Sequence, residues 1–370
     1  MECSWLRTTL VAFILYIECV CSMKTFYPKN TTTVLRKIAV DSTGRNLYVG
    51  GINMLYHLNA DMTEEIGVVQ TGPQKDSKTC LRDNVNDGKS TCDIKLYDDY
   101  IQLLQVYESG GVLITCGTLS LGKCVGRDLH NISNVNYTSD AYVFVNTEET
   151  DSTESVIATV ETQSILFVGK SYVETTDYLE QTHEGVKNLI DGVQLEGDDF
   201  LRSFETNSGQ RPFLIRRKKN TLSKYASFVK GVFYMNNSNS VYTLLQIKTK
   251  TTQMSVSKIS KICANNTGTH NSYEDFPINC TGFPYVQGGT VIKHEQGEVL
   301  VTLFSSTEYI TETTPCAVCV YTEDELLEGF RESRIRPPVC DNEMAYQVDY
   351  LEMTQGSEDL SKLFSSGKKI

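Results

Sequence analysis

Cysteines are the residues of this chain with the clearest capacity for chemistry. Of the 12 cysteines in 370 residues, Cys3, Cys19 and Cys21 lie in the first 22. The others lie at Cys80, Cys92, Cys116, Cys124, Cys263, Cys280, Cys316, Cys319 and Cys340. The first four form two short-range pairs, which an oxidising compartment bridges readily. The later ones are odd in number, which predicts a free thiol, an intermolecular bond or partners outside this chain.

No catalytic or metal-binding constellation accompanies these cysteines. The histidines are scattered, at His57, His130, His183, His270 and His294. The sequence contains no H-E-x-x-H pair, G-x-S-x-G elbow or G-x-G-x-x-G loop. Cys316 and Cys319 make a formal C-x-x-C, but on a predicted strand of an exported chain we interpret them as one disulfide cysteine and one spare. The sequence therefore predicts no enzyme, cofactor or metal.

The N-terminus resembles a secretory signal peptide. One arginine, Arg7, precedes an apolar stretch from Leu10 to Val20, and small residues follow at Cys21 and Ser22. Glu18 interrupts the stretch, which is shorter than the ~20 apolar residues of a membrane anchor. We therefore expect residues 1–22 to be removed and the chain to enter the secretory pathway.

Sequons for N-linked glycans agree with export. They begin at Asn30, Asn131, Asn136, Asn236, Asn265 and Asn279.

The net charge of -12 argues against nucleic acid and anionic lipid as partners. Arg216 to Lys219 form the one basic run. We interpret the run as a solvated loop, with a protease-sensitive loop or an acidic-partner contact as the alternatives.

Strand signals dominate the chain. Alternating apolar residues flank a turn or short break in five hairpin units, spaced by roughly 50–75 residues, which is typical of the blades of a β-propeller. A β-sandwich is the alternative, but its strands would come at tighter intervals. The units lie at 38–58, 103–117, 156–169, 231–245 and 290–303.

Five units predict an incomplete propeller, because a closed ring of such blades needs more chain. We expect a partial propeller domain over residues 23–340 and a divergent polar tail over residues 341–370. Between Glu323 and Glu332, apolar residues at helical spacing predict a helix.

Four stretches, in order, resemble the N-terminal sema domain of plexins, the cell-surface receptors for semaphorins. They match the family patterns VG-x-x-N-x-LY-x-L with TGP and DS-x-x-C, then CG-x-x-x-x-G-x-C, then SKI-x-x-x-C with Y-x-x-FP-x-x-C, and lastly an A-L-C-A-F strand. In this chain the stretches run from Leu47 to Cys80, from Cys116 to Cys124, from Ser257 to Cys280 and from Ala317 to Leu326.

The resemblance implies an all-β, sema-type seven-bladed propeller, of which about five blades are present. It also implies the disulfides Cys80–Cys92, Cys116–Cys124 and Cys280–Cys319. The family cysteines matching Cys263 and Cys340 pair with partners further along, so both are expected to be unpaired here. Cys316 has no family counterpart.

The resemblance further implies semaphorin recognition, sema domain to sema domain, and a part in receptor self-association. The residues that bind are not motif-like and stay unknown. We expect a full-length receptor to lie at the extracellular face of the plasma membrane and the chain as it stands to be secreted. Compared with the family, this chain lacks the later blades, the cysteine-rich module, the immunoglobulin-like repeats, the membrane span and the cytoplasmic GTPase-activating region. The alternatives are a semaphorin-type ligand, a scatter-factor-type receptor tyrosine kinase ectodomain and a secreted propeller hydrolase.

Overall fold

The structure is a computed structural model of the whole chain. It describes residues 25–28, 33–78, 94–139, 144–147, 153–160, 162–172, 188–197, 200–201, 215–217, 225–249, 255–264, 272–294, 297–333 and 351–352. Within these residues, no helix is long and apolar enough to cross a membrane.

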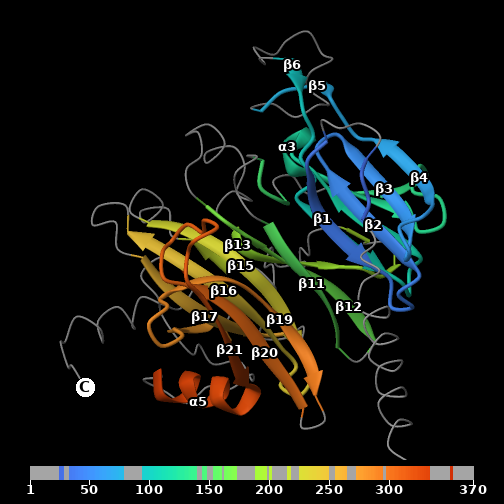
Figure 1. Cartoon of the computed structure of the whole chain (residues 1–370). Helices are drawn as coiled ribbons and strands as arrows, with labels where there is room; N and C mark the ends of the chain where they lie inside the picture. Colours follow the sequence, from blue (N-terminus) through green and yellow to red (C-terminus); the bar gives the residue numbers. More distant parts are fainter. Residues whose placement is uncertain are drawn as a thin grey trace, which may run out of the picture.

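Five antiparallel sheets follow one another along the chain (Figure 1). Sheet one contains β1 (Leu35–Val40), β2 (Asn46–Gly51), β3 (Met54–Asn59) and β4 (Glu65–Gln70). Sheet two contains β7 (Leu103–Tyr107), β8 (Val112–Cys116), β9 (Cys124–Asp128) and β10 (Val135–Thr138). Sheet three contains β11 (Thr153–Val160), β12 (Gln163–Lys170), β13 (Asn188–Gln194), β14 (Ile215–Arg217) and β22 (Leu351–Glu352). Sheet four contains β15 (Tyr225–Met235), β16 (Ser240–Thr249), β17 (Ser255–Cys263) and β18 (Glu274–Pro277). Sheet five contains β19 (Tyr285–His294), β20 (Gly297–Ser305) and β21 (Cys316–Thr322).

Each sheet starts with one of the predicted hairpins. In the first hairpin, Asp41 closes the turn: its Oδ1 accepts hydrogen bonds from the amides of Arg45 at 2.8 Å and Asn46 at 3.1 Å. Burial opposes ionisation of Asp41, but the bonds from Asn46, Thr43 and Arg45 outweigh it and lower the pKa to about 2. An ionised turn residue of this kind holds both strands in register.

Consecutive sheets pack face to face, which is the arrangement of propeller blades. Tyr48 and Leu55 of sheet one contact the cluster that contains Leu113 of sheet two. Leu166 joins sheet three to sheet two, and Val229 joins sheet four to sheet three. The first strands β1, β7, β11, β15 and β19 are successive neighbours and thus line the inner side of the arc. The predicted all-β propeller arrangement is therefore confirmed, with five blades in the described residues.

Helix α5 (Glu323–Ser333) follows β21 and confirms the predicted helix. Its Leu326 and Phe330 are buried in the core shared by sheets four and five. Phe330 packs edge to face on Phe276, with ring centroids 4.7 Å apart. An apolar stripe on one side of a helix explains why the segment docks on the blades instead of extending a strand.

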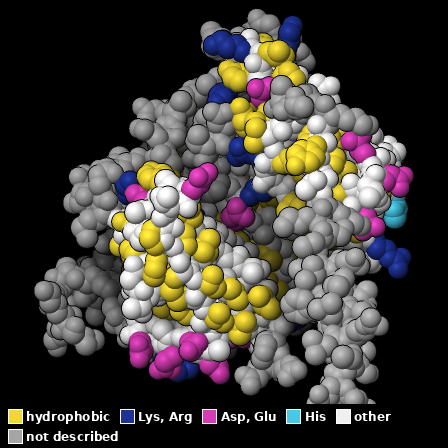
Figure 2. Space-filling view, viewed as in Figure 1, with side chains coloured by type: hydrophobic (Ala, Val, Ile, Leu, Met, Phe, Trp, Pro, Cys, Tyr) yellow, Lys and Arg dark blue, Asp and Glu magenta, His cyan; other side chains and the backbone are white. Residues whose placement is uncertain are grey.

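The other face of sheet five is apolar and exposed (Figure 2). Ile292, Leu303, Val318 and Val320 lie there, with Val318 at 65% exposure. The register places Leu303 opposite Val318 and Val301 opposite Val320. This face has the residue types of a blade interior.

Two features were not predicted. A small sheet of β5 (Gln74–Asp76) and β6 (Lys95–Tyr97) extends away from the blades between sheets one and two (Figure 1). In addition, β22 from the predicted tail pairs with β14 in sheet three. The leader and the rest of the tail lie outside the described residues, so these boundaries stay predictions.

Candidate ligand-recognition surfaces

The base of the β5–β6 extension is organised by Asn53. The Asn53 carbonyl oxygen accepts hydrogen bonds from the amides of Thr71 at 2.8 Å and Gly72 at 3.4 Å. Its side-chain Oδ1 accepts from the amide of Asp99 at 2.7 Å, and its Nδ2 donates to Asp98 Oδ1 at 2.7 Å. One residue thus fixes the Thr71-Gly72-Pro73 segment, whose Gly72–Pro73 peptide is cis, against the segment after β6.

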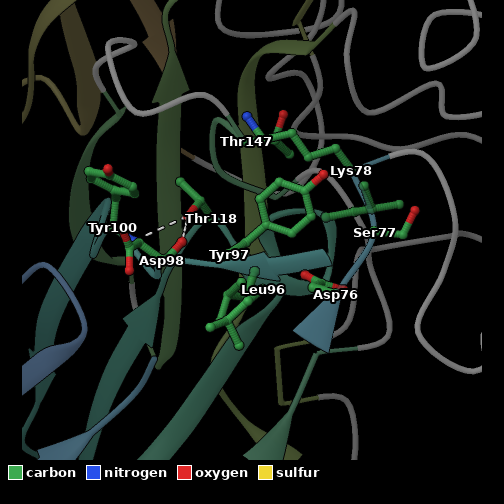
Figure 3. A pocket seen from close by; sticks show the side chains of 11 residues that line it. Asp76, Ser77, Lys78, Leu96, Tyr97, Asp98, Tyr100, Thr118 and Thr147 are labelled. Atoms are coloured by element: carbon green, nitrogen blue, oxygen red, sulfur yellow. Dashed lines mark hydrogen bonds between the residues drawn. The ribbon is translucent and has the colours of Figure 1, made fainter. Parts of the chain in front are cut away.

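A pocket of about 280 Å³ lies beside this junction. Figure 3 shows the Tyr97 ring between the side chains of Thr118 and Lys78. The Tyr100 amide donates to Thr118 Oγ1 at 3.1 Å, and this hydroxyl donates to the Asp98 carbonyl oxygen at 3.3 Å. The lining residues are Asp76, Ser77, Lys78, Leu96, Tyr97, Asp98, Tyr100, Thr118, Leu119, Leu121 and Thr147.

Asp76 is the buried carboxylate of this pocket, with 5% of its surface exposed. Its Oδ2 accepts a hydrogen bond from the Ser120 amide at 2.5 Å. Its Oδ1 is closed to solvent and has no hydrogen-bond partner. Burying an acceptor without a donor costs about 1–3 kcal/mol of folding free energy, and more for a charged group. The unpaired Oδ1 of Asp76 is therefore energetically unfavourable.

Asp99 lies next to the pocket residue Asp98 and is also buried. Burial raises the pKa of Asp99, although hydrogen bonds and the nearby Arg127 oppose the shift. Gly117 lies against it: a Cβ at Gly117 would collide with the Asp99 carboxyl group. The glycine of the Cys116-Gly117 motif is therefore explained sterically, since only glycine at position 117 leaves room for the Asp99 carboxyl group.

The described residues contain no cluster of three or more His, Cys, Asp or Glu side chains that could hold a metal ion. His57 is structural: its ring stacks on Tyr48 with centroids 4.5 Å apart, and its Nε2 lies 2.9 Å from Asn46 Oδ1. Burial lowers the pKa of His57. His183 and His270 lie outside the described residues.

Two disulfides are present among the described residues. Cys116 and Cys124 face each other across β8 and β9, with their Cα atoms 4.2 Å apart. Cys280, in the segment between β18 and β19, is bonded to Cys319 of β21, with Cα atoms 6.0 Å apart, and so ties sheet four to sheet five. Both pairings are those that the plexin resemblance implies.

The prediction for Cys263 is wrong. Cys263 is bonded in a disulfide, and its partner lies outside the described residues. It is buried at the end of β17, where a cross-link is protected from solvent. The prediction failed because it took a partner beyond the end of this chain from the family pattern. Cys316 is a free, exposed cysteine as predicted, whereas Cys80, Cys92 and Cys340 lie outside the described residues.

Four sequons lie in the described residues, and their asparagines are exposed. Asn131 follows β9, Asn136 lies in β10, and Asn279 follows β18. The side chain of Asn236 differs, because its Nδ2 donates to Glu298 Oε1 at 2.8 Å. Asn30 and Asn265 lie outside the described residues. In the basic run, Arg216 and Arg217 belong to β14 instead of a loop, and Lys218 and Lys219 lie outside them.

The Asp76 pocket was not predicted from the sequence. Its only signal was the Asp76-Ser77 pair within the first motif stretch. The other walls come from residues about 20 to 70 positions further along the chain, and nothing in the sequence places them beside β5.

No protein-family model matches the chain. Among curated proteins, it is 27% identical to zebrafish (Danio rerio) plexin A3 over 293 residues, which covers 72% of this chain but 15% of that protein. Among solved structures, the extracellular region of plexin A4 matches with a TM-score of 0.69 and 19% identity, over 84% of this chain and 36% of that chain. A solved complex of Drosophila plexin A with semaphorin 1b matches with a TM-score of 0.50 and 15% identity, over 82% of this chain and 54% of that chain.

The chain thus spans about 15% of the length of the curated relative that it matches. That relative is a plexin, and the fold of this chain matches that of the solved plexin A4 region. The resemblance in the sequence motifs is therefore confirmed: the chain is a plexin-like, sema-type propeller.

Proposed function

We propose that this chain is the extracellular ligand-recognition domain of a plexin-like receptor and that it binds semaphorins through protein–protein contacts, without catalysis. The observation that carries the proposal is the similarity to plexin A3 over 72% of the chain. The solved plexin A–semaphorin 1b complex supports semaphorin as the partner class.

The physical properties of the chain agree with this role. Sheets packed face to face supply a rigid frame, and loops on such a frame commonly carry recognition. Disulfides and exposed sequons support an extracellular position. Residues 1–22 are proposed to be the signal peptide, residues 23–340 the sema domain and residues 341–370 the divergent tail. The exposed apolar face of sheet five supports packing against a further sheet in a full-length receptor.

The experiment is a binding panel. The secreted chain is immobilised and exposed to purified semaphorin ectodomains from several classes, with a plexin ectodomain as a separate analyte. We expect saturable binding to at least one semaphorin. Binding to the plexin alone would instead support a semaphorin-type ligand, and binding to none, together with hydrolysis of a glycan or an ester, would support the hydrolase alternative.

Receptor self-association is part of the proposal. Sedimentation equilibrium of the secreted chain, with and without the bound semaphorin, measures it directly. A concentration-dependent increase in mass is expected, and a constant monomer mass up to high micromolar concentration would contradict it.

A further inference from the structure

The pocket beside the β5–β6 sheet has the size of a site for one long side chain. Its volume of about 280 Å³ lies just below the ~300–1,000 Å³ range of small-molecule sites. Two tyrosines and three leucines supply aromatic and aliphatic walls, and carboxylates supply the negative charge. The tyrosines and leucines are Tyr97, Tyr100, Leu96, Leu119 and Leu121.

The charges of this pocket favour a cationic ligand. Among the described lining residues, Asp76 and Asp98 outnumber the single cation, Lys78. Asp76 is nine-tenths buried, and its Oδ1 lacks any donor. An unpaired buried carboxylate oxygen is stabilised most by a donor that carries positive charge.

A guanidinium fits this pocket better than a metal ion does. Calcium takes six to eight oxygen ligands, with several carboxylates among them, and the described residues hold no cluster that could supply these. A guanidinium needs fewer acceptors, donates in a planar fork to a carboxylate and stacks on aromatic rings. Its aliphatic stem can pack on the leucines of the wall.

We propose that this pocket binds an arginine side chain of a protein partner, with Asp76 as its carboxylate acceptor. Asp98, which is exposed, adds attraction for the incoming charge. Oδ1 of Asp76 is closed to solvent in the free chain, so a neighbouring side chain moves when the guanidinium enters. Lys78 is the longest flexible side chain on the wall, and its Nζ lies 5.9 Å from the Tyr97 ring centroid.

Lys78 therefore lies where it would compete with an arginine for the Tyr97 ring. It competes in two ways, since it covers one aromatic face and repels a second cation. Removal of its charge should strengthen binding, whereas removal of either carboxylate charge should weaken it. These opposite directions distinguish a ligand site from a set of structural contacts.

The test uses the secreted full chain and two short peptides, acetyl-Gly-Arg-Gly-amide and the same peptide with citrulline, which keeps the shape of arginine but lacks its charge. Ligand-observed saturation-transfer NMR titrations measure the two affinities. We expect saturable, low-millimolar binding of the arginine peptide and at least fivefold weaker binding of the citrulline peptide. Equal binding of the two peptides would overturn the proposal.

Variants locate the site. Asp76→Asn keeps an acceptor for the Ser120 amide and should weaken arginine binding at least fivefold, while Lys78→Ala should strengthen it about twofold. Glu332→Gln, at an exposed position on α5, is the charge-matched control and should leave binding unchanged. Arginine binding that Asp76→Asn and Asp98→Asn leave unaltered would overturn the proposal.

Thermal unfolding separates the site from a structural role. Without peptide, Asp76→Asn should unfold at the same or a higher temperature than the parent, because it removes an unpaired buried charge. A lower unfolding temperature would mean that the charge stabilises the fold and would contradict the assignment. If calcium raises the unfolding temperature and the arginine peptide does not, the pocket binds a metal ion instead of a guanidinium. This result would also contradict the proposal. Failure here leaves semaphorin binding untouched, since that is measured on the parent chain.

Discussion

Lys37 of β1 and Glu154 of β11 form an ion pair, with 2.9 Å between Nζ and Oε1. The same ammonium donates to the Thr153 carbonyl oxygen at 2.8 Å. These contacts join sheet one directly to sheet three, past the sheet between them. The inner strands of the arc are therefore held by polar contacts in addition to the apolar cores between neighbouring sheets.

A double-mutant cycle with Lys37→Met and Glu154→Gln should measure this contact. The side chains are 23% and 36% exposed, so solvent screens the pair, and we expect a coupling of about 0.5–1 kcal/mol in the free energy of unfolding. Urea denaturation of the four proteins gives the value. Strictly additive effects would show that the pair contributes nothing.

Gly117→Ala should destabilise the chain by about 1–3 kcal/mol, the usual range for overpacking a filled site. The added methyl group would collide with the Asp99 carboxyl group. Gly288→Ala is the matched control, because a Cβ there has its nearest neighbour at 3.7 Å. Urea denaturation compares the two variants, and an equal loss in both would refute the steric account of Gly117.

Native thiol labelling should modify Cys316 and leave Cys263 unmodified. Cys316 is free and exposed, whereas Cys263 is disulfide-bonded and buried. Labelling with a maleimide, followed by peptide mass spectrometry, identifies the modified cysteines. Cys316→Ser is the control that removes the expected signal, and label on Cys263 in the folded chain would contradict the structure.

His57 should make the chain less stable in mild acid. Burial lowers its pKa in the folded state below the value of 6.5, so the unfolded state binds the proton more tightly. The contribution of neutral His57 to the free energy of unfolding is fully present above pH 6.5. It is lost as the pH falls from 6.5 towards the folded-state pKa. Urea denaturation at pH 7.5 and 5.5 should show a larger loss in the parent than in His57→Gln. Equal losses would mean that His57 does not titrate differently in the two states.

Glycan occupancy should differ among the exposed sequons. Asn131, Asn136 and Asn279 should be occupied, while Asn236 should be occupied less, because its Nδ2 already donates to Glu298. Glu298→Ala should raise occupancy at Asn236. Glycopeptide mass spectrometry measures each site, and equal occupancy at all four sequons in the parent would contradict this ranking.

Much of the fold was predictable because it rests on local patterns. Alternation of apolar residues gave the paired hairpins, including the unit predicted at 103–117, where the structure has strands Leu103–Tyr107 and Val112–Cys116. The stripe of Leu326, Leu327 and Phe330 gave α5. The pairing of Cys280 with Cys319 came from the family resemblance, since spacing alone leaves several pairings open.

The remaining features depend on contacts between distant parts of the chain. Lys37 and Glu154 are 117 positions apart, and the Asp76 pocket combines β5, β6 and the turn at Thr118. No local pattern records such proximity. The pairing of β22 with β14 was likewise hidden, because two residues are too few to show an alternation.

The central claim is semaphorin recognition, and competition tests it most directly. A semaphorin ectodomain that binds the immobilised chain is titrated with a soluble plexin ectodomain, with serum albumin as the control competitor. We predict that the plexin displaces the semaphorin from this chain in a saturable manner and that albumin does not. Absence of semaphorin binding, or binding that excess plexin leaves unchanged, would contradict the proposed function.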